Sequence, residues 1–389
     1  LKPLLDNLKK NKIEIISSGG TYRTIKKLKF KCREVSEYTS SPEILGGRVK
    51  TLHPKIHAGI LNKRKNKSHL NDLKKNDFEN IDLVIVNFYP FEKTLMDTNN
   101  ENKIIENIDI GGPTLVRAAA KNYNYVTVIT NVNQYNDLIL NLKKNNGITT
   151  LNFRKKMALK AFTDTGHYDS LISNYFNKKL EDKFPNRKLI SLSLIENLRY
   201  GENPHQLGSI YAQYDLGIKK INGKHLSYNN YNDIFAALKI TQTFPKNQGT
   251  VIVKHTNPCG VSINKNNIES IKLALKCDPV SAFGGIVCCN FKLTRNIANE
   301  LSKTFFEVII ANGFEEVALK ILKRKKNLRI IDAKNYKNTS SYNVVSQMGS
   351  FLLQTPDNKI FLPKDFKVVS KVKPNNKLLK TLIFAFNIC

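Results

Sequence analysis

The feature that most constrains the fold is a repeated order of apolar run, glycine turn and helical stretch. The apolar run at 13–16 leads into a Ser-Ser-Gly-Gly-Thr turn, and residues 22–28 have helical spacing. The same order recurs where the turn at 109–113 precedes a helical stretch at 114–122 and an apolar run at 125–130. Strands that alternate with helices in this way are typical of α/β domains. The first half is therefore predicted to form a doubly wound, mostly parallel sheet.

A second α/β domain is predicted after residue 188. The stretch 177–188 is polar, charged and contains proline, so we interpret it as a linker. Beyond it, apolar runs at 250–253 and 286–289 flank a helical stretch at 268–276. A length of 389 residues suits two domains. We therefore expect domains at 1–176 and 189–389.

The charge of the chain raises the question of polyanionic partners. Its 62 lysines and arginines outnumber 32 acidic residues, for a net charge of +30. The positive charge is spread along the chain and mixed with asparagine, without a legible nucleic-acid-binding module, so we interpret it as a solvated surface. No apolar run reaches the ~18 residues of a membrane span. We expect neither a nucleic acid nor a membrane partner.

Cysteine usage indicates a reducing compartment. The six cysteines include no C-x-x-C pair, and a disulfide framework is not expected in a chain of this length. We therefore expect a cytoplasmic protein. The adjacent Cys288 and Cys289 lie in an apolar run and are predicted to be core residues.

Two short motifs in the first half suggest an anion site. Ser18, Gly19, Gly20 and Thr21 lie between a strand and a helix, where backbone N–H groups can face an anion. Arg48 and Lys50 follow within Gly-Arg-Val-Lys-Thr, and both side chains can bind phosphate. Each motif alone also fits an ordinary turn or a solvated pair of cations.

Three further segments are predicted to converge on this site. Asn87 and Tyr89 follow an apolar strand, Asp109 begins a glycine turn, and Lys121 ends the next helical stretch. Ligands of open α/β sheets bind at the carboxyl ends of the strands. A lysine at a helix end also has a plain electrostatic explanation.

Longer motifs carry a family resemblance. The first half contains SSGGT, GGRVKTLHPKIHAGIL, VNFYPF, ENIDIGGPTLVRAAAKN and YDSLISNYF, and the second contains LRYGENPHQ, VKHTNPCG and DPVSAFGGIV. In this order they resemble the bifunctional purine biosynthesis enzymes that join an IMP cyclohydrolase to an AICAR formyltransferase. The resemblance implies a methylglyoxal-synthase-like first domain and a second domain built from cytidine-deaminase-like lobes.

For cyclisation, the resemblance implies Lys121 as the acid/base, helped by Lys50, Tyr89 and Asp109. It implies nucleotide contacts from Ser18, Gly19, Gly20, Thr21, Arg48, Val49, Thr51, Val86, Asn87 and Ile110.

For formyl transfer, the resemblance implies Lys254 and His255 as the catalytic pair, and nucleotide contacts from Arg199, Tyr200, Gly284 and Glu307. Some members carry aspartate at the position of Glu307. The implied co-substrate is 10-formyltetrahydrofolate, no metal or tightly bound cofactor is implied, and a homodimer is expected.

The residue types suit this chemistry. The AICAR amine needs a base as it attacks the formyl group, and histidine has an unperturbed pKa of about 6.5. A neighbouring lysine can stabilise the oxyanion. On residue type alone, His255 equally fits a structural role at the end of a strand.

Two departures from the family pattern are noted. The family's opening strand, with its Ser-Asp-Lys-Thr-Gly segment, is not found before Leu1, and the second transferase lobe is expected to be largely missing after Cys389. Two alternatives therefore stay open: an inactive fragment of the enzyme, or a non-catalytic basic protein that binds nucleotides or nucleic acid. A steep salt dependence of DNA affinity would favour the latter.

Overall fold

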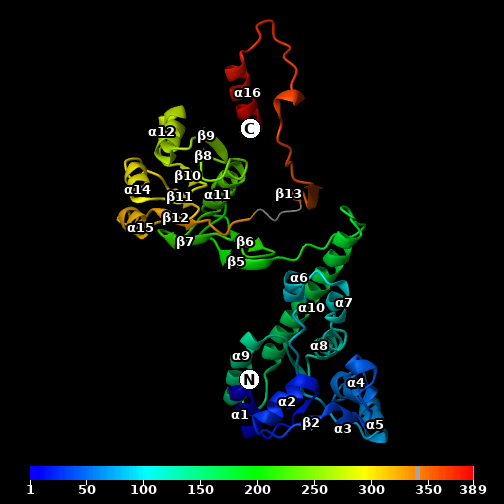
Figure 1. The fold of residues 1–389 in the computed structure, drawn as a ribbon. Coiled ribbons are helices and arrows are strands. Elements are labelled where there is room, and N and C mark those ends of the chain that lie inside the picture. Colours follow the sequence, from blue (N-terminus) through cyan, green and yellow to red (C-terminus); the bar gives the residue numbers. More distant parts are fainter. Residues whose placement is uncertain (338–341, 389) are drawn as a thin grey trace. The chain divides into compact units, whose positions relative to one another are not determined.

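The computed structural model describes residues 1–337 and 342–388, which form two compact units that divide after Ser191 (Figure 1). No helix in these two ranges is both long and apolar enough to cross a membrane.

Unit 1 alternates short parallel strands with helices. The strands are β1 (Ile16–Ser17), β2 (Arg33–Glu34), β3 (Leu83–Ile85) and β4 (Thr127–Ile129). The helices are α1 (Lys2–Lys10), α2 (Gly19–Lys27), α3 (Val35–Thr39), α4 (Pro54–Leu61), α5 (Lys67–Lys75), α6 (Phe91–Asp97), α7 (Glu101–Glu106), α8 (Gly111–Lys121), α9 (Tyr135–Lys144) and α10 (Leu151–Lys179). β1 pairs with β2 and β3 pairs with β4, both in parallel. The predicted α/β class and the parallel pairing are confirmed.

Three details of unit 1 differ from the sequence prediction. The strand expected at 13–16 is shorter and begins later, because β1 comprises only Ile16 and Ser17. The helix expected from Thr114 begins three residues earlier, at Gly111. The 29-residue α10 was not predicted, and it extends three residues into the expected linker because Asn177, Lys178 and Lys179 continue the helix.

Unit 2 is built on a mixed six-stranded sheet, with further strands paired outside it. The strands of the whole unit are β5 (Ser193–Asn197), β6 (Ser209–Ala212), β7 (Lys219–Asn222), β8 (Gly249–Lys254), β9 (Asn257–Ile263), β10 (Ile286–Cys289), β11 (Val308–Ala311), β12 (Arg329–Asp332), β13 (Asn343–Gln347) and β14 (Ser350–Gln354). Its helices are α11 (Tyr228–Thr241), α12 (Asn267–Cys277), α13 (Pro279–Ala282), α14 (Arg295–Leu301), α15 (Glu316–Leu322) and α16 (Asn376–Ile388). The large sheet has the order β7-β12-β11-β10-β8-β9.

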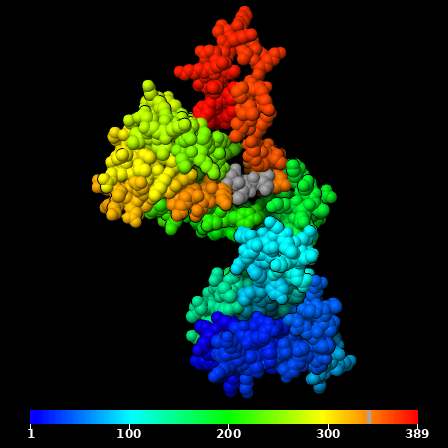
Figure 2. Space-filling view, viewed as in Figure 1, coloured from blue at the N-terminus to red at the C-terminus, as the bar shows by residue number. Residues whose placement is uncertain are grey.

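Helices cover both faces of this sheet. Buried residues of α12, α14 and α15 form one core against it, and buried residues of α11 form the core on the other face, where α16 also packs (Figure 1). In Figure 2 the yellow to orange part of the chain, which contains α14 and α15, forms one continuous surface. Cys288 and Cys289 are buried in β10 and contribute to opposite cores, so their predicted core role is confirmed.

The strand directions bring several loops to one edge of the sheet. β10, β11 and β12 are mutually parallel and begin at this edge, whereas β8 is antiparallel to β10 and ends there. The edge therefore carries Lys254 at the end of β8, Gly284 just before β10 and Glu307 just before β11.

Candidate active sites

The first candidate site begins where β1 runs into α2. Ser18 is the N-cap of α2, and Gly19 has a left-handed φ of 56° that suits glycine. A Cβ atom added to Gly19 would lie 3.3 Å from Nζ of Lys50. The ammonium group of Lys50 thus lies beside the first turn of α2, and the structure brings the SSGGT and RVKT motifs together as predicted.

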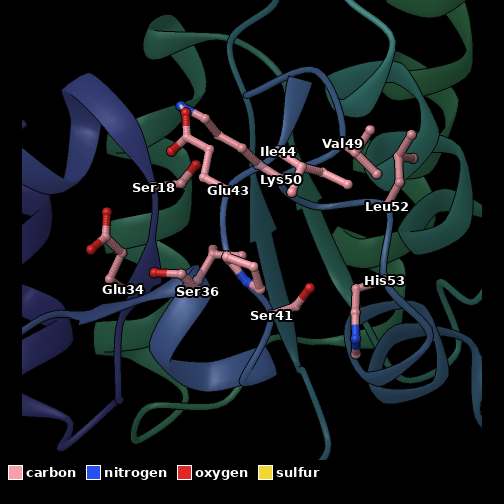
Figure 3. Close-up of a pocket in the computed structure, with 12 residues that line it drawn as sticks. Ser18, Glu34, Ser36, Ser41, Glu43, Ile44, Val49, Lys50, Leu52 and His53 are labelled. Atoms are coloured by element: carbon pink, nitrogen blue, oxygen red, sulfur yellow. Dashed lines mark ion pairs between the residues drawn. The ribbon is translucent and has the colours of Figure 1, made fainter. Parts of the chain in front are cut away.

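A cavity of about 70 Å³ adjoins this turn. Its lining comprises Ser18, Glu34, Val35, Ser36, Ser41, Pro42, Glu43, Ile44, Val49, Lys50, Leu52 and His53. Lys50 forms an ion pair with Glu43 (Nζ–Oε1 2.7 Å), and Figure 3 shows the two side chains meeting beside Ser18. Gly47 lies against both, since a Cβ there would be 2.3 Å from Cε of Lys50. Glu43 was not predicted as a site residue.

Arg48 has a different environment from Lys50. Its guanidinium group pairs with the carboxylate of Glu106 at the end of α7, and both side chains are exposed. Arg48 is not among the residues that line the cavity, whereas Val49 is. Of the two cations predicted to bind phosphate, the structure directs Lys50 into the cavity and leaves Arg48 outside it.

Asp109 forms the centre of a second cluster in unit 1. Its carboxylate accepts the N–H of Gly112 at 2.8 Å, at the start of α8. Burial raises the pKa of Asp109 above its ordinary value, and the N–H groups of Gly112 and Tyr89 offset part of that rise. The backbone N–H of Asp109 donates to Oη of Tyr168 at 2.7 Å, which ties the turn to α10. Tyr168 was not predicted, because no local pattern marks a contact 59 residues away.

The remaining predicted contacts of unit 1 lie at the start of α8 and just after β3. Oγ1 of Thr51 would lie 2.8 Å from a Cβ added to Gly111, and Ile110 is exposed at the N-cap of α8. Val86 follows β3 directly and donates its N–H to the carbonyl of Ile129. The exposed Asn87 donates from Nδ2 to Oη of Tyr135 at 3.0 Å.

Lys121 is the exception. It is the last residue of α8, so it lies roughly 15 Å from Gly111 at about 1.5 Å rise per residue. The neighbouring α4 supports this placement. Thr51, just before α4, adjoins the start of α8. Asn122, just after the end of α8, donates hydrogen bonds to the carbonyls of Ile60 and Asn62 at the end of α4. Helix α8 thus places Lys121 at the end opposite the Asp109 turn in its own chain, and its predicted role in the same site stays a prediction.

The second candidate site lies at the sheet edge of unit 2. Nζ of Lys254 donates to the carbonyl of Phe283 at 3.1 Å, next to Gly284. The N–H of Glu307 donates to the carbonyl of Gly285. The predicted residues Lys254, Gly284 and Glu307 are thus brought together by adjacent strands.

Glu307 is held by two residues that were not predicted. Its carboxylate accepts Nδ2 of the buried Asn230 at 3.2 Å and lies 3.5 Å from Nη1 of Arg329. Asn230 belongs to a polar run at the start of α11 whose capping by Ser227 is legible in the sequence. The carboxylate of Glu307, the predicted acidic contact, is therefore held by Asn230 and Arg329 in this chain.

Arg199 and Tyr200 lie in a loop tied to the same helix. Nδ2 of Asn229 donates to the carbonyl of Glu202 at 3.3 Å, which holds the loop near the start of α11. The guanidinium group of Arg199 lies 5.5 Å from the centre of the Tyr200 ring. Among the residues described, no group of three or more His, Cys, Asp or Glu side chains is arranged to hold a metal ion.

Together these features define a two-unit α/β protein, with a cavity lined by the Lys50–Glu43 ion pair in one unit and with Lys254, Gly284 and Glu307 at one sheet edge in the other. The family model of the AICARFT/IMPCHase bienzyme matches residues 119–389, and that of the MGS-like domain matches residues 1–114. The chain belongs to the AICARFT/IMPCHase bienzyme family.

Curated relatives agree with this assignment. The "Bifunctional purine biosynthesis protein PurH" of Prochlorococcus marinus (strain MIT 9211) is 43% identical over 390 residues, which cover 96% of this chain and 75% of the relative. The protein of the same name from Acetivibrio thermocellus is 42% identical over 389 residues, which cover 97% of this chain and 75% of the relative. The chain in a crystal structure of ForH is 29% identical to this one; the match covers 45% of this chain and 91% of that chain, with a TM-score of 0.40.

The chain is accordingly a bifunctional purine biosynthesis enzyme that unites formyltransferase and cyclohydrolase activities. The alternative of a non-catalytic basic binding protein is not favoured by these matches.

Proposed function

We propose that the two activities are divided between the two units. In this proposal residues 1–176 close the purine ring of IMP, residues 177–188 link the domains, and residues 189–389 contribute to formyl transfer. The observation that supports it best is that Lys254, Gly284 and Glu307 lie at one sheet edge in unit 2, while Lys50 and Asp109 belong to unit 1.

Formyl transfer uses 10-formyltetrahydrofolate as the co-substrate in this proposal. The AICAR amine attacks the formyl carbon, and neutral His255 accepts the amine proton as the new C–N bond forms. Lys254 stabilises the oxyanion, and the folate nitrogen leaves with a proton to give tetrahydrofolate and FAICAR. Arg199, Tyr200, Gly284 and Glu307 bind the nucleotide.

Cyclisation follows in unit 1. The carboxamide nitrogen of FAICAR attacks the formyl carbon, and the formyl oxygen leaves as water to give IMP. Lys50 and Tyr89 polarise that oxygen by donating hydrogen bonds, and Asp109 orients the carboxamide. Lys121 is the proposed acid/base. Because α8 places it away from Asp109 in its own chain, the proposal is that it acts from a second copy of the chain. The first turn of α2, with Ser18, Gly19, Gly20 and Thr21, receives the phosphate.

A cytoplasmic homodimer is part of the proposal. The five cysteines in the described ranges are all free, as in a reducing compartment.

The test is a His255→Ala variant of the full-length protein. Single-turnover formyl transfer is expected to fall roughly 10²–10⁴-fold, the usual contribution of one general base, while AICAR affinity is kept. His225→Ala removes another exposed histidine of unit 2 and is the matched control. Normal single-turnover chemistry with weakened AICAR binding would show that His255 is a contact and not the base.

A further inference from the structure

The loop that carries His255 has an unusual backbone. β8 and β9 pair antiparallel with Lys254 opposite Asn257, which leaves His255 and Thr256 as a two-residue hairpin loop. Both have positive φ, 55° for His255 and 64° for Thr256. Hairpin loops of this kind favour asparagine and glycine, and a β-branched residue at positive φ is strained. The strain must therefore be offset by contacts that hold the loop.

One of these contacts comes from α11. Oδ1 of Asp233 accepts the backbone N–H of Thr256 at 2.7 Å. The other side-chain bonds at the loop come from the hairpin itself, since Thr256 Oγ1 and Asn257 Nδ2 both donate to the carbonyl of His255. Asp233 thus fastens the strained loop to a neighbouring element.

The same helix also fixes the opposite side of the site. Asn230, three residues before Asp233, donates to Glu307. Residues three apart lie on one face of a helix. This face of α11 therefore sets the spacing between the His255 loop and the acidic contact at Glu307.

We infer that Asp233 is a positioning residue for formyl transfer, which holds His255 in register with the nucleotide by anchoring the strained loop to α11. The inference rests on the proposed role of His255. It assigns Asp233 no contact with substrate and no proton transfer.

Two substitutions at Asp233 test it in the full-length protein. Asp233→Ala removes the acceptor, and kcat for formyl transfer is expected to fall about 10²-fold, as for a misplacement of about 1 Å, with KM for AICAR near wild type. Asp233→Asn keeps an oxygen that accepts the Thr256 N–H and is expected to retain most of kcat. Asp215→Ala is the matched control, because Asp215 accepts a loop N–H, that of Gly217 at 2.8 Å, elsewhere in unit 2.

A suppressor distinguishes anchoring from chemistry. Thr256→Gly keeps the N–H and removes the cost of positive φ at residue 256, so the loop depends less on its anchor. The double variant Asp233→Ala/Thr256→Gly is expected to regain most of the lost kcat. A double variant as slow as Asp233→Ala alone, or an Asp233→Asn as slow as Asp233→Ala, would overturn the inference.

The outcome is separable from the proposed function. If His255→Ala keeps its chemistry, the assignment of His255 fails whatever Asp233 does. If His255→Ala is slow and Asp233→Ala is normal, only the positioning role fails. AICAR affinity and circular dichroism, measured on the same preparations, report whether unit 2 of each variant is folded.

Discussion

At the scale of the residue, Asp109 predicts how cyclisation depends on pH. Burial raises the pKa of its carboxyl above the ordinary value for aspartate, which is about 3.9. As pH falls, Asp109 therefore becomes protonated at a higher pH than an exposed aspartate would, and in the proposed mechanism it then no longer orients the carboxamide. We expect the acid limb of the cyclisation profile to have its midpoint above 3.9.

The effect of Asp109 on how the free energy of unfolding changes with pH is opposite in sign to that of a paired carboxylate. Because the folded state holds the Asp109 proton more tightly than the unfolded chain, protonation of Asp109 favours folding as pH falls through its raised pKa. Loss of cyclisation in this range is therefore not explained by Asp109-driven unfolding. The measurement is kcat/KM against pH with circular dichroism at each point, and an acid limb at or below the ordinary aspartate pKa would contradict the prediction.

At the scale of the element, α10 supports the Asp109 turn through one hydroxyl group. Oη of Tyr168 accepts the N–H of Asp109, and the ring packs against Phe88 and Phe91. Tyr168→Phe keeps the ring but leaves this partly buried N–H without its partner, so the free energy of unfolding should fall by about 1–3 kcal/mol. Urea denaturation measures this change.

Tyr175 offers a matched control on the same helix. Its ring contacts Phe91, and its hydroxyl is buried without a hydrogen-bond partner in the described residues. Tyr175→Phe should therefore be neutral or slightly stabilising, because only an unsatisfied group is removed. Equal losses in the two variants would mean that the hydrogen bond to Asp109 contributes nothing.

The elements also show which parts of the molecule were predictable from the sequence. The turn before α2 and the apolar strand β10 were predicted, because glycine pairs and apolar runs act locally. The left-handed loop at His255 and Thr256 was not, since neither residue favours that conformation and its anchor, Asp233, is 23 residues away. Lys121 was predicted at the end of a helix, but the sequence pattern does not reveal which end of α8 adjoins the site.

At the scale of the whole molecule, the placement of Lys121 makes a prediction about assembly. Asp109 and Thr51, which follows Lys50 in the chain, adjoin the start of α8, and Lys121 ends it. In the proposed arrangement Lys121 takes part in cyclisation as Lys121 of the partner subunit. We therefore expect Lys50→Ala and Lys121→Ala each to abolish cyclisation in pure homodimers while formyl transfer in the full-length protein persists.

Mixed dimers distinguish this arrangement from a site within one chain. When the two inactive variants are co-expressed, each heterodimer contains one site with both lysines intact. In that site the chain with Lys121→Ala supplies Lys50, and the chain with Lys50→Ala supplies Lys121. Random pairing makes half of the dimers mixed, so cyclisation should recover to about a quarter of the wild-type rate. Sites confined to one chain would give no recovery, because every chain would lack one of the two lysines. Normal cyclisation by pure Lys121→Ala would instead remove Lys121 from the mechanism and leave Lys50, Tyr89 and Asp109 to carry it.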